Sequence, residues 1–126
     1  MSRVLLDSDV LIDLLRGREA TRAFLREVTE HAVPCCSVIS VAEIHAGMRP
    51  EERDHTATLF NALVIFQVTR PIAELAGDFR RRARARKLEL TDCLIAATAM
   101  VESASLATGN IRDYPMPELT VLEARR

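Results

Sequence analysis

Residues 4–17 read VLLDSDVLIDLLRG, and this stretch decides the class of the fold. The apolar run Val4–Leu6 has the length and composition of a buried strand, and it stops at Asp7. After Asp7, apolar side chains recur at helical spacing until Gly17 ends the pattern: Val10, Leu11, Leu14 and Leu15. The stretch therefore predicts a strand, a turn that carries a carboxylate, and a helix.

The same alternation of strands and helices continues along the chain. Further strands are expected over residues 33–39, 64–68, 105–107 and 119–122. Helices are expected over residues 23–28, 41–47, 51–63, 71–88 and 92–103, with Ser40 and Thr91 as caps. The last helix is apolar almost all round and should be packed on two sides. Strands separated by helices pair in parallel through right-handed crossovers, so the predicted fold is α/β, a three-layer α/β/α sandwich with a central, mostly parallel sheet.

The length and composition fit one globular domain that spans residues 1–126. The chain has 126 residues, 48% of them hydrophobic, which is enough for one core without disulfide bonds or structural zinc. Its three cysteines lie in apolar runs and are interpreted as small buried hydrophobic residues. No apolar run approaches the roughly 20 residues of a membrane span, and the N-terminus lacks the pattern of a signal peptide. We therefore expect a soluble, cytoplasmic protein.

Four acidic residues lie at junctions between elements rather than on polar helix faces. Asp7 ends the first strand, Glu43 follows the second, Asp113 follows the fourth, and Asp92 begins the apolar helix. Because ligands collect outside the carboxyl ends of parallel strands, these side chains are expected to converge at one edge of the sheet. Such a cluster without a lysine calls for a hard divalent cation, Mg²⁺ or Mn²⁺, and it suits the hydrolysis of phosphodiester bonds.

Each acid also has a simpler interpretation when it is taken alone. A carboxylate at a helix N-terminus can satisfy free N–H groups and the helix dipole, which is enough to explain Asp92 or Glu43 singly. Asp9 and Asp13 are interpreted as part of a solvated helix face, with Asp13 paired with Arg16. A carboxylate at Asp7 directly ends a buried strand and is costly unless a metal or hydrogen bonds receive it.

Four segments, in order along the chain, resemble the signature blocks of PIN-domain ribonucleases. They are VLLDSDVLIDLLRG at 4–17, SVISVAEI at 37–44, LTDCLIAATA at 90–99 and TGNIRDY at 108–114. More closely, the chain resembles the VapC-type toxins of bacterial toxin–antitoxin modules. The resemblance implies a PIN-like fold, Mg²⁺-dependent endoribonuclease activity on RNA, a homodimer, and a cognate antitoxin that blocks the site.

The resemblance also implies roles for individual residues. It places the family's acidic quartet on Asp7, Glu43, Asp92 and Asp113, and its supporting polar positions on Ser8 and Asn110. All four would form the metal site, with Asp7 and Asp92 as ligands directly or through water. Glu43 would orient the attacking water or a metal-bound water, and Asp113 would complete the site. Asn110 and Thr108 are expected to organise their loop through Asx-type hydrogen bonds. Asp9 stands where many relatives carry Asn and is left outside the site.

A basic segment precedes the last acidic helix. Seven basic and two acidic residues between Arg70 and Lys87 give a local charge of +5, so the rest of the chain carries −6 of the total of −1. Cations at a helix C-terminus offset its dipole, but six basic residues within positions 80–87 can also bind phosphates. We expect Arg82, Arg84 and Arg86 to steer RNA toward the acidic site, and other arginines to pair with acids of the antitoxin or the dimer mate.

Other functional classes fit the sequence less well. The histidines His31, His45 and His55 have no paired spacing with the cysteines, and no glycine-rich phosphate loop is present. A haloacid dehalogenase-type phosphatase also begins with Asp-x-Asp, but it needs a lysine that the chain does not supply outside its basic segment. Two alternatives stay open: a PIN-domain nuclease that is not a toxin, and a PIN-like module that binds RNA or a partner without cutting.

Overall fold

A five-stranded sheet, with every pairing parallel, forms the centre of the structure, a computed structural model that describes residues 2–124. The strands lie in the order β3-β2-β1-β4-β5. Their bounds are β1 (Ser2–Leu6), β2 (Ala32–Ser37), β3 (Val64–Phe66), β4 (Ala104–Thr108) and β5 (Val121–Glu123). This arrangement places the carboxyl end of β1, in the middle of the sheet, between those of β2 and β4.

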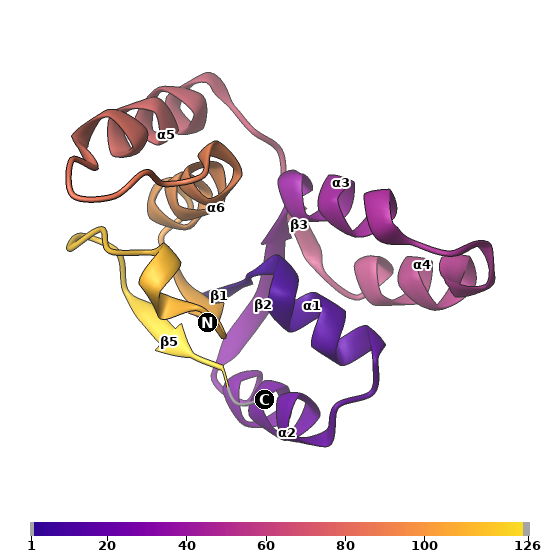
Figure 1. Cartoon of the computed structure of the whole chain (residues 1–126). Coiled ribbons are helices and arrows are strands. Elements are labelled where there is room, and N and C mark those ends of the chain that lie inside the picture. The colour runs from indigo at the N-terminus through magenta and orange to yellow at the C-terminus, as the bar shows by residue number, and fades with distance from the viewer. Residues whose placement is uncertain (1, 125–126) are drawn as a thin grey trace.

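Helices cover both faces of the sheet, as Figure 1 shows. One side carries α1 (Ser8–Leu15), α2 (Glu19–Val28), α3 (Val38–Gly47) and α4 (Arg53–Asn61), and the other carries α5 (Arg70–Arg82) and α6 (Leu90–Val101). Two short 3-10 turns complete the described elements, η1 (Pro50–Glu52) and η2 (Ile111–Asp113). The predicted α/β/α sandwich is confirmed. None of the helices within residues 2–124 is long and apolar enough to cross a membrane.

The core is divided into two layers by the sheet. Successive strand side chains point to opposite faces, so Cys35 packs with α5 and α6 while its neighbour Cys36 packs with the helices of the other side. Both thiols are fully buried, as the sequence predicts. Helix α6 lies between α5 and the sheet, and its middle is buried on all sides, from Ile95 to Ala99. The expected central position of this apolar helix is confirmed.

The second strand ends earlier than the apolar pattern indicates. β2 stops at Ser37, whose hydroxyl accepts a hydrogen bond from the N–H of Ile39 over 3.1 Å and caps α3. Ser40, the expected cap, lies inside the helix and is buried. The prediction was wrong because a short apolar run fits a strand and a buried helix equally well. As a result, Glu43 lies in the second turn of α3 rather than the first.

The long basic helix is also shorter than expected. α5 ends at Arg82, and residues 83–89 form an irregular link to α6, so Arg84, Arg86 and Lys87 are not helical. Residues 84–87 offer no apolar side chain larger than alanine to bury, and a helix gains most of its stability from packing an apolar face. α6 begins after Glu89, without a side-chain cap from the expected Thr91.

Candidate active site

The carboxylate of Asp7 is held in place at the carboxyl end of β1. Its Oδ1 accepts a hydrogen bond from the N–H of Ser8, and its Oδ2 accepts one from the hydroxyl of Thr108 at the end of β4, both over 2.8 Å. Asp7 is only 6% exposed, and this burial raises the pKa of its carboxyl, against the opposing effect of the two hydrogen bonds. The parallel pairing of β1 with β4 therefore fixes the first predicted acid in one orientation.

Asp92 lies in the first turn of α6, within electrostatic reach of the three other predicted acids. The pKa of Asp92 is raised to about 6, mainly because the carboxylate is partly removed from water. The negative charges of Asp7, Asp113 and Glu43 add smaller contributions in the same direction. The acids thus come from four separate elements and converge beyond the carboxyl ends of the strands. The structure brings the other three members of the predicted quartet within electrostatic reach of Asp92.

Glu43 is exposed on α3 and is tied to the first turn of α1. The Ser8 hydroxyl donates a hydrogen bond to Glu43 Oε1 over 2.6 Å and lies 2.9 Å from the hydroxyl of the buried Ser40. This contact links the helices that follow β1 and β2. Ser8 therefore has a supporting position beside an acid, as the resemblance implies, and it sets the direction of the Glu43 side chain.

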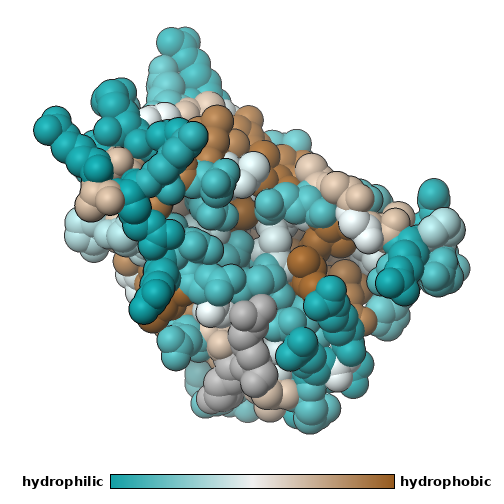
Figure 2. Space-filling model, in the orientation of Figure 1, coloured by the Kyte–Doolittle hydropathy of each residue, from teal (hydrophilic) through white to brown (hydrophobic). Residues whose placement is uncertain are grey.

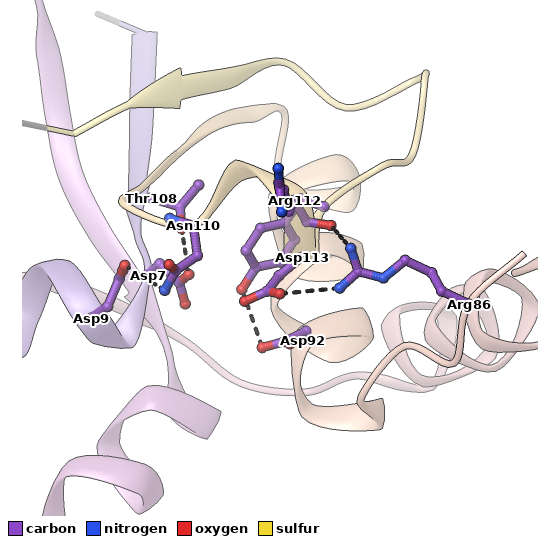
Figure 3. A network of polar contacts seen from close by, with 9 residues as sticks. Asp7, Asp9, Arg86, Asp92, Thr108, Asn110, Arg112 and Asp113 are labelled. Carbon is purple, nitrogen blue, oxygen red and sulfur yellow. Dashed lines mark hydrogen bonds and ion pairs between the residues drawn. The ribbon is translucent and has the colours of Figure 1, made fainter.

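The loop after β4 is fastened by Asp9, contrary to the expected solvated position of this residue. Asp9 Oδ2 accepts hydrogen bonds from the N–H of Gly109 over 2.9 Å and from the Asn110 side-chain amide over 3.2 Å. The N–H of Asn110 also donates to the Thr108 hydroxyl over 3.0 Å (Figure 3). The Thr108 hydroxyl thus orders the loop locally, as expected, whereas the Asn110 side chain bonds to the distant Asp9 and not within its own loop.

Asp13 was also wrongly assigned to a solvated face. It is 2% exposed, and its Oδ1 lies 3.2 Å from Nε of Arg18 rather than pairing with Arg16. Helix α1 ends in a turn in which Gly17 has a φ of 72°, and the chain then folds back so that the N–H of Arg18 donates to the Asp13 carbonyl. Asp13 therefore stabilises the end of α1.

Asp113, in η2, forms an ion pair with the basic link. Its Oδ1 accepts from Nη2 of Arg86 over 3.3 Å, and the carbonyl of Arg112 accepts from Nη1 of the same guanidinium over 2.6 Å. Figure 3 shows Arg86 reaching toward these two acceptors. One of the three arginines expected to steer RNA is thus bound to one of the four acids.

The other two arginines of that set differ from each other. Arg82 forms an ion pair with Glu118 over 2.8 Å, with its guanidinium over the ring of Phe79. Arg84 is exposed and makes no ion pair within residues 2–124. Figure 2 shows hydrophilic side chains over α5 and the link that follows it. The basic segment is therefore a solvated surface beside the site, with part of its charge already paired.

Tyr114 is a site residue that sequence reasoning did not select. It is 4% exposed, its hydroxyl donates to Asp92 Oδ1 over 3.4 Å, and it also hydrogen-bonds Asp7. Burial and the charges of these two carboxylates raise the pKa of Tyr114, so its hydroxyl stays protonated as a donor. The only available signal was its place directly after Asp113 at the end of the fourth signature block.

The donor set of the site fits a hard divalent cation bound partly through water. The acids bring only carboxylate oxygens, and burial, with a smaller effect of neighbouring negative charges, raises the pKa of both Asp7 and Asp92. Among residues 2–124, no three His, Cys, Asp or Glu side chains are arranged so that together they could hold one ion. Mg²⁺ commonly binds through one or two carboxylates and keeps several waters, so two carboxylates suffice. The three histidines are exposed and lie outside this site.

Comparisons with known proteins identify the family of the chain. The family model of the PIN domain matches residues 4–114. Ribonuclease VapC10 of Mycobacterium tuberculosis is 42% identical over 117 residues, which cover 91% of this chain and 88% of that protein. Ribonuclease VapC19 of the same species is 37% identical over 119 residues, covering 91% and 95%.

Solved structures share the fold at lower sequence identity. A toxin–antitoxin complex from Klebsiella pneumoniae contains a chain with a TM-score of 0.81 at 24% identity, covering 96% of this chain and 97% of that one. DNA-bound VapBC from Salmonella typhimurium gives a TM-score of 0.84 at 20% identity, covering 97% and 98%. With its acids gathered beyond the parallel strands and the family model matched from residue 4 to 114, the chain belongs to the PIN-domain family.

Proposed function

We propose that this protein is the toxin of a toxin–antitoxin module, an endoribonuclease that hydrolyses RNA phosphodiester bonds at the site of Asp7, Glu43, Asp92 and Asp113. The observation that carries the proposal is the convergence of these acids around Asp92, whose pKa is raised to about 6 by burial first and then by the negative charges of the other three. The 42% identity to a protein named a ribonuclease supports RNA as the substrate class.

The cofactor of this reaction is Mg²⁺, with Mn²⁺ as a substitute. Asp7 and Asp92 would hold the ion, and Glu43 and Asp113 would complete the site through water. When bound, such an ion lowers the pKa of a coordinated water and neutralises charge that develops on the phosphoryl oxygens. The protein supplies the orientation, because Ser8 and Thr108 fix both oxygens of Asp7.

In this proposal, Glu43 orients the attacking water. Its Oε1 accepts from the Ser8 hydroxyl, which fixes the side chain, while its exposed position on α3 gives water access. A carboxylate that is held by a neighbour and open to solvent can direct the lone pair of a water and accept its proton. Tyr114 donates to the metal-binding acids and remains neutral.

RNA, an antitoxin and a second copy of the chain are the proposed partners. The basic residues Arg82, Arg84 and Arg86 lie beside the site and were expected to contact RNA phosphates. The structural neighbours include toxin–antitoxin complexes, which supports a cognate antitoxin. The resemblance to VapC-type toxins implies that this antitoxin blocks the site. We expect the protein to act as a homodimer in the cytoplasm, where its substrate is found.

The deciding experiment is cleavage of an end-labelled RNA by the purified protein, with Mg²⁺ and with EDTA. Asp7→Asn and Asp92→Asn should each lower the cleavage rate by more than about 100-fold, since loss of even an outer-shell partner of a metal costs 10–100-fold. Asp78→Asn is the matched control, because Asp78 pairs with Arg81 on the surface of α5. Equal cleavage by wild type, Asp7→Asn and Asp92→Asn would contradict the assignment.

A second experiment separates a toxin from another PIN-domain nuclease or a binding module. Induced expression in bacteria should arrest growth, and Asp7→Asn should relieve the arrest. Co-expression of the small protein encoded by an adjacent reading frame should relieve it as well. Cleavage in vitro without growth arrest would favour a nuclease that is not a toxin, and arrest by Asp7→Asn would favour a module that acts by binding.

A further inference from the structure

Arg86 joins two segments that each carry an acid of the site. It belongs to the irregular link of residues 83–89, which leads directly into the helix of Asp92, and its two acceptors lie 26 and 27 residues away. Nη1 donates to the Arg112 carbonyl over 2.6 Å, and Nη2 donates to Asp113 Oδ1 over 3.3 Å (Figure 3). Two nitrogens of one planar guanidinium thus hold a backbone group and a side chain of adjacent residues, a contact that lysine cannot reproduce.

The turn that carries Asp113 is short, and the buried Tyr114 follows it directly. η2 is a three-residue 3-10 turn, closed by backbone bonds from the N–H of Asp113 to the Asn110 carbonyl and from the N–H of Tyr114 to the Ile111 carbonyl. Asp9 fastens the start of the loop through Gly109 and Asn110. Arg86 fastens the end of η2, so the turn is fixed at both ends.

The ion pair leaves Asp113 able to act in the site. Arg86 engages Oδ1, whereas Oδ2 has no hydrogen-bond partner within the part of the chain that the structure describes. Only one oxygen of the Asp113 carboxylate is thus engaged by Arg86. Its side chain is 40% exposed, which keeps it open to a ligand. Arg86 therefore orients the carboxylate without burying it.

We propose that Arg86 is a positioning residue that holds Asp113 and the η2 turn at the site, and that it does not contact RNA phosphates. The catalytic part of this inference rests on the proposed function. Ion-paired and hydrogen-bonded as it is, Arg86 would have to give up two contacts to bind a phosphate. Arg84, two residues earlier, is also exposed and makes no ion pair within residues 2–124, so phosphate binding is assigned to Arg84.

The first test needs no catalysis and compares Arg86→Gln with Arg84→Gln, two variants with the same loss of charge in the same link. Amide hydrogen exchange, followed by NMR without divalent cations, should be faster at Asp113 and Tyr114 in Arg86→Gln and unchanged there in Arg84→Gln. Far-UV circular dichroism should show both variants folded. Unchanged exchange at η2 in a folded Arg86→Gln protein would overturn the inference even if the wild type proved inactive.

The second test measures RNA cleavage by Arg86→Gln, Asp113→Asn and the double variant. Arg86→Gln should lower kcat about 10–100-fold, as expected for a partner that orients a site carboxylate. Since Arg86 acts through Asp113, the double variant should be no slower than Asp113→Asn within about twofold. Multiplicative losses would show that Arg86 acts by another route. Arg86→Lys keeps the charge but loses the forked contact, so its kcat should recover only in part, and full recovery would also contradict the proposal.

The third test separates positioning from RNA contact by salt dependence. The affinity for a single-stranded RNA is measured by fluorescence anisotropy in EDTA over a range of salt concentrations. Arg84→Gln should reduce the slope of log affinity against log salt by about 0.7, the value for one phosphate contact, and Arg86→Gln should leave it unchanged. A slope reduced equally by both variants would make Arg86 an RNA contact. A wild type that cleaves no RNA would refute the proposed function, whereas a cleaving wild type matched by Arg86→Gln would refute the role of Arg86 alone.

Discussion

The hydroxyl of Thr108 donates a hydrogen bond to the carboxylate of Asp7 over 2.8 Å, across 101 residues of sequence. The contact exists because β1 and β4 are parallel neighbours, with Leu6 opposite Ala107, so that both strands end at the same level. Thr108 is fully buried and also accepts from the N–H of Asn110. One hydroxyl therefore fixes the first acid of the site and the loop that leads to the last.

Replacing Thr108 with valine should weaken both the fold and the site. Valine keeps the shape but leaves a buried carboxylate oxygen without its donor, which costs about 1.5–3 kcal/mol for a hydrogen bond to a charged group. Urea unfolding at pH 7.5 should show this loss, together with slower RNA cleavage. Thr108→Ser retains the hydroxyl and should stay close to wild type, and a Thr108→Val protein of unchanged stability would contradict the role.

Replacing Arg18 with glutamine should destabilise the protein more than replacing Arg16. Arg18 pairs with the buried Asp13, so its loss leaves a nearly inaccessible carboxylate without this cation, at a cost of about 1–3 kcal/mol. Arg16 is exposed and has no ion pair among the described residues, so Arg16→Gln should change stability by less than about 0.5 kcal/mol. The test is the urea concentration at the midpoint of unfolding of each variant. Equal midpoints would argue against the Asp13–Arg18 pair.

The metal-free protein should become more stable as the pH falls from 7.5 toward 5. The pKa of Asp92 is raised to about 6 in the folded state from its usual 3.8, so the folded state binds the proton more tightly than the unfolded state does. The ionised form of Asp92 therefore destabilises the folded state. This destabilisation is complete above pH 6 and is lost as the pH falls toward 4. Asp92→Asn should remove it and stabilise the protein at pH 7.5 by on the order of 1–2 kcal/mol. Thermal melts in EDTA of both proteins across this pH range test the difference.

Divalent cations should offset the destabilisation by ionised Asp92 at neutral pH. An ion that binds only the folded state stabilises it by about 2.7 kcal/mol at a concentration 100 times its Kd. Mg²⁺ or Mn²⁺ should therefore raise the melting temperature of wild type at pH 7.5, and EDTA should restore the lower value. Asp7→Asn and Asp92→Asn should respond weakly, while Asp78→Asn should respond like wild type. An equal shift in all four proteins would indicate binding away from the acidic site.

Removing the hydroxyl of Ser8 should slow cleavage with little change in RNA affinity. Ser8 donates to Glu43 Oε1 over 2.6 Å, so Ser8→Ala frees the side chain that would orient the attacking water. We expect kcat to fall about tenfold, the lower end of the range for an outer-shell partner. Ser8→Thr preserves the hydroxyl and serves as the control. A change in KM alone would instead indicate that Ser8 contacts the substrate.

The sequence predicts the sheet, the layers and the four acids because each depends on local pattern and chain order. Asp7 could be selected since it ends a buried strand, and parallel topology then brings the other strand-end acids to the same edge. Asp13 could not be placed in this way. Helical spacing shows on which side of α1 the Asp13 side chain lies. Its burial, however, depends on the turn at Gly17, which brings Arg18 back over the end of the helix.

Local sequence pattern could not identify the residues whose role depends on partners far along the chain. Asp9 faces the loop at Gly109, Arg86 faces Asp113, and Tyr114 points into the site from the core. Helix ends were uncertain for a related reason. The apolar run around Ser37 fits strand and helix alike, and the alternating basic residues after Arg82 carry good helix formers but no apolar face to bury.

The central position of β1 has a consequence for the time at which the protein acquires activity during synthesis. β1 emerges first from the ribosome, but its neighbour β4 and the turn with Asp113 follow only after all the helices have been made. A nascent chain halted before residue 104 can pair β1 with β2, yet it lacks the donor to Asp7 and the fourth acid. Long-range strand pairing of this kind is acquired late, so the proposed nuclease site stays incomplete until translation of the domain is almost finished.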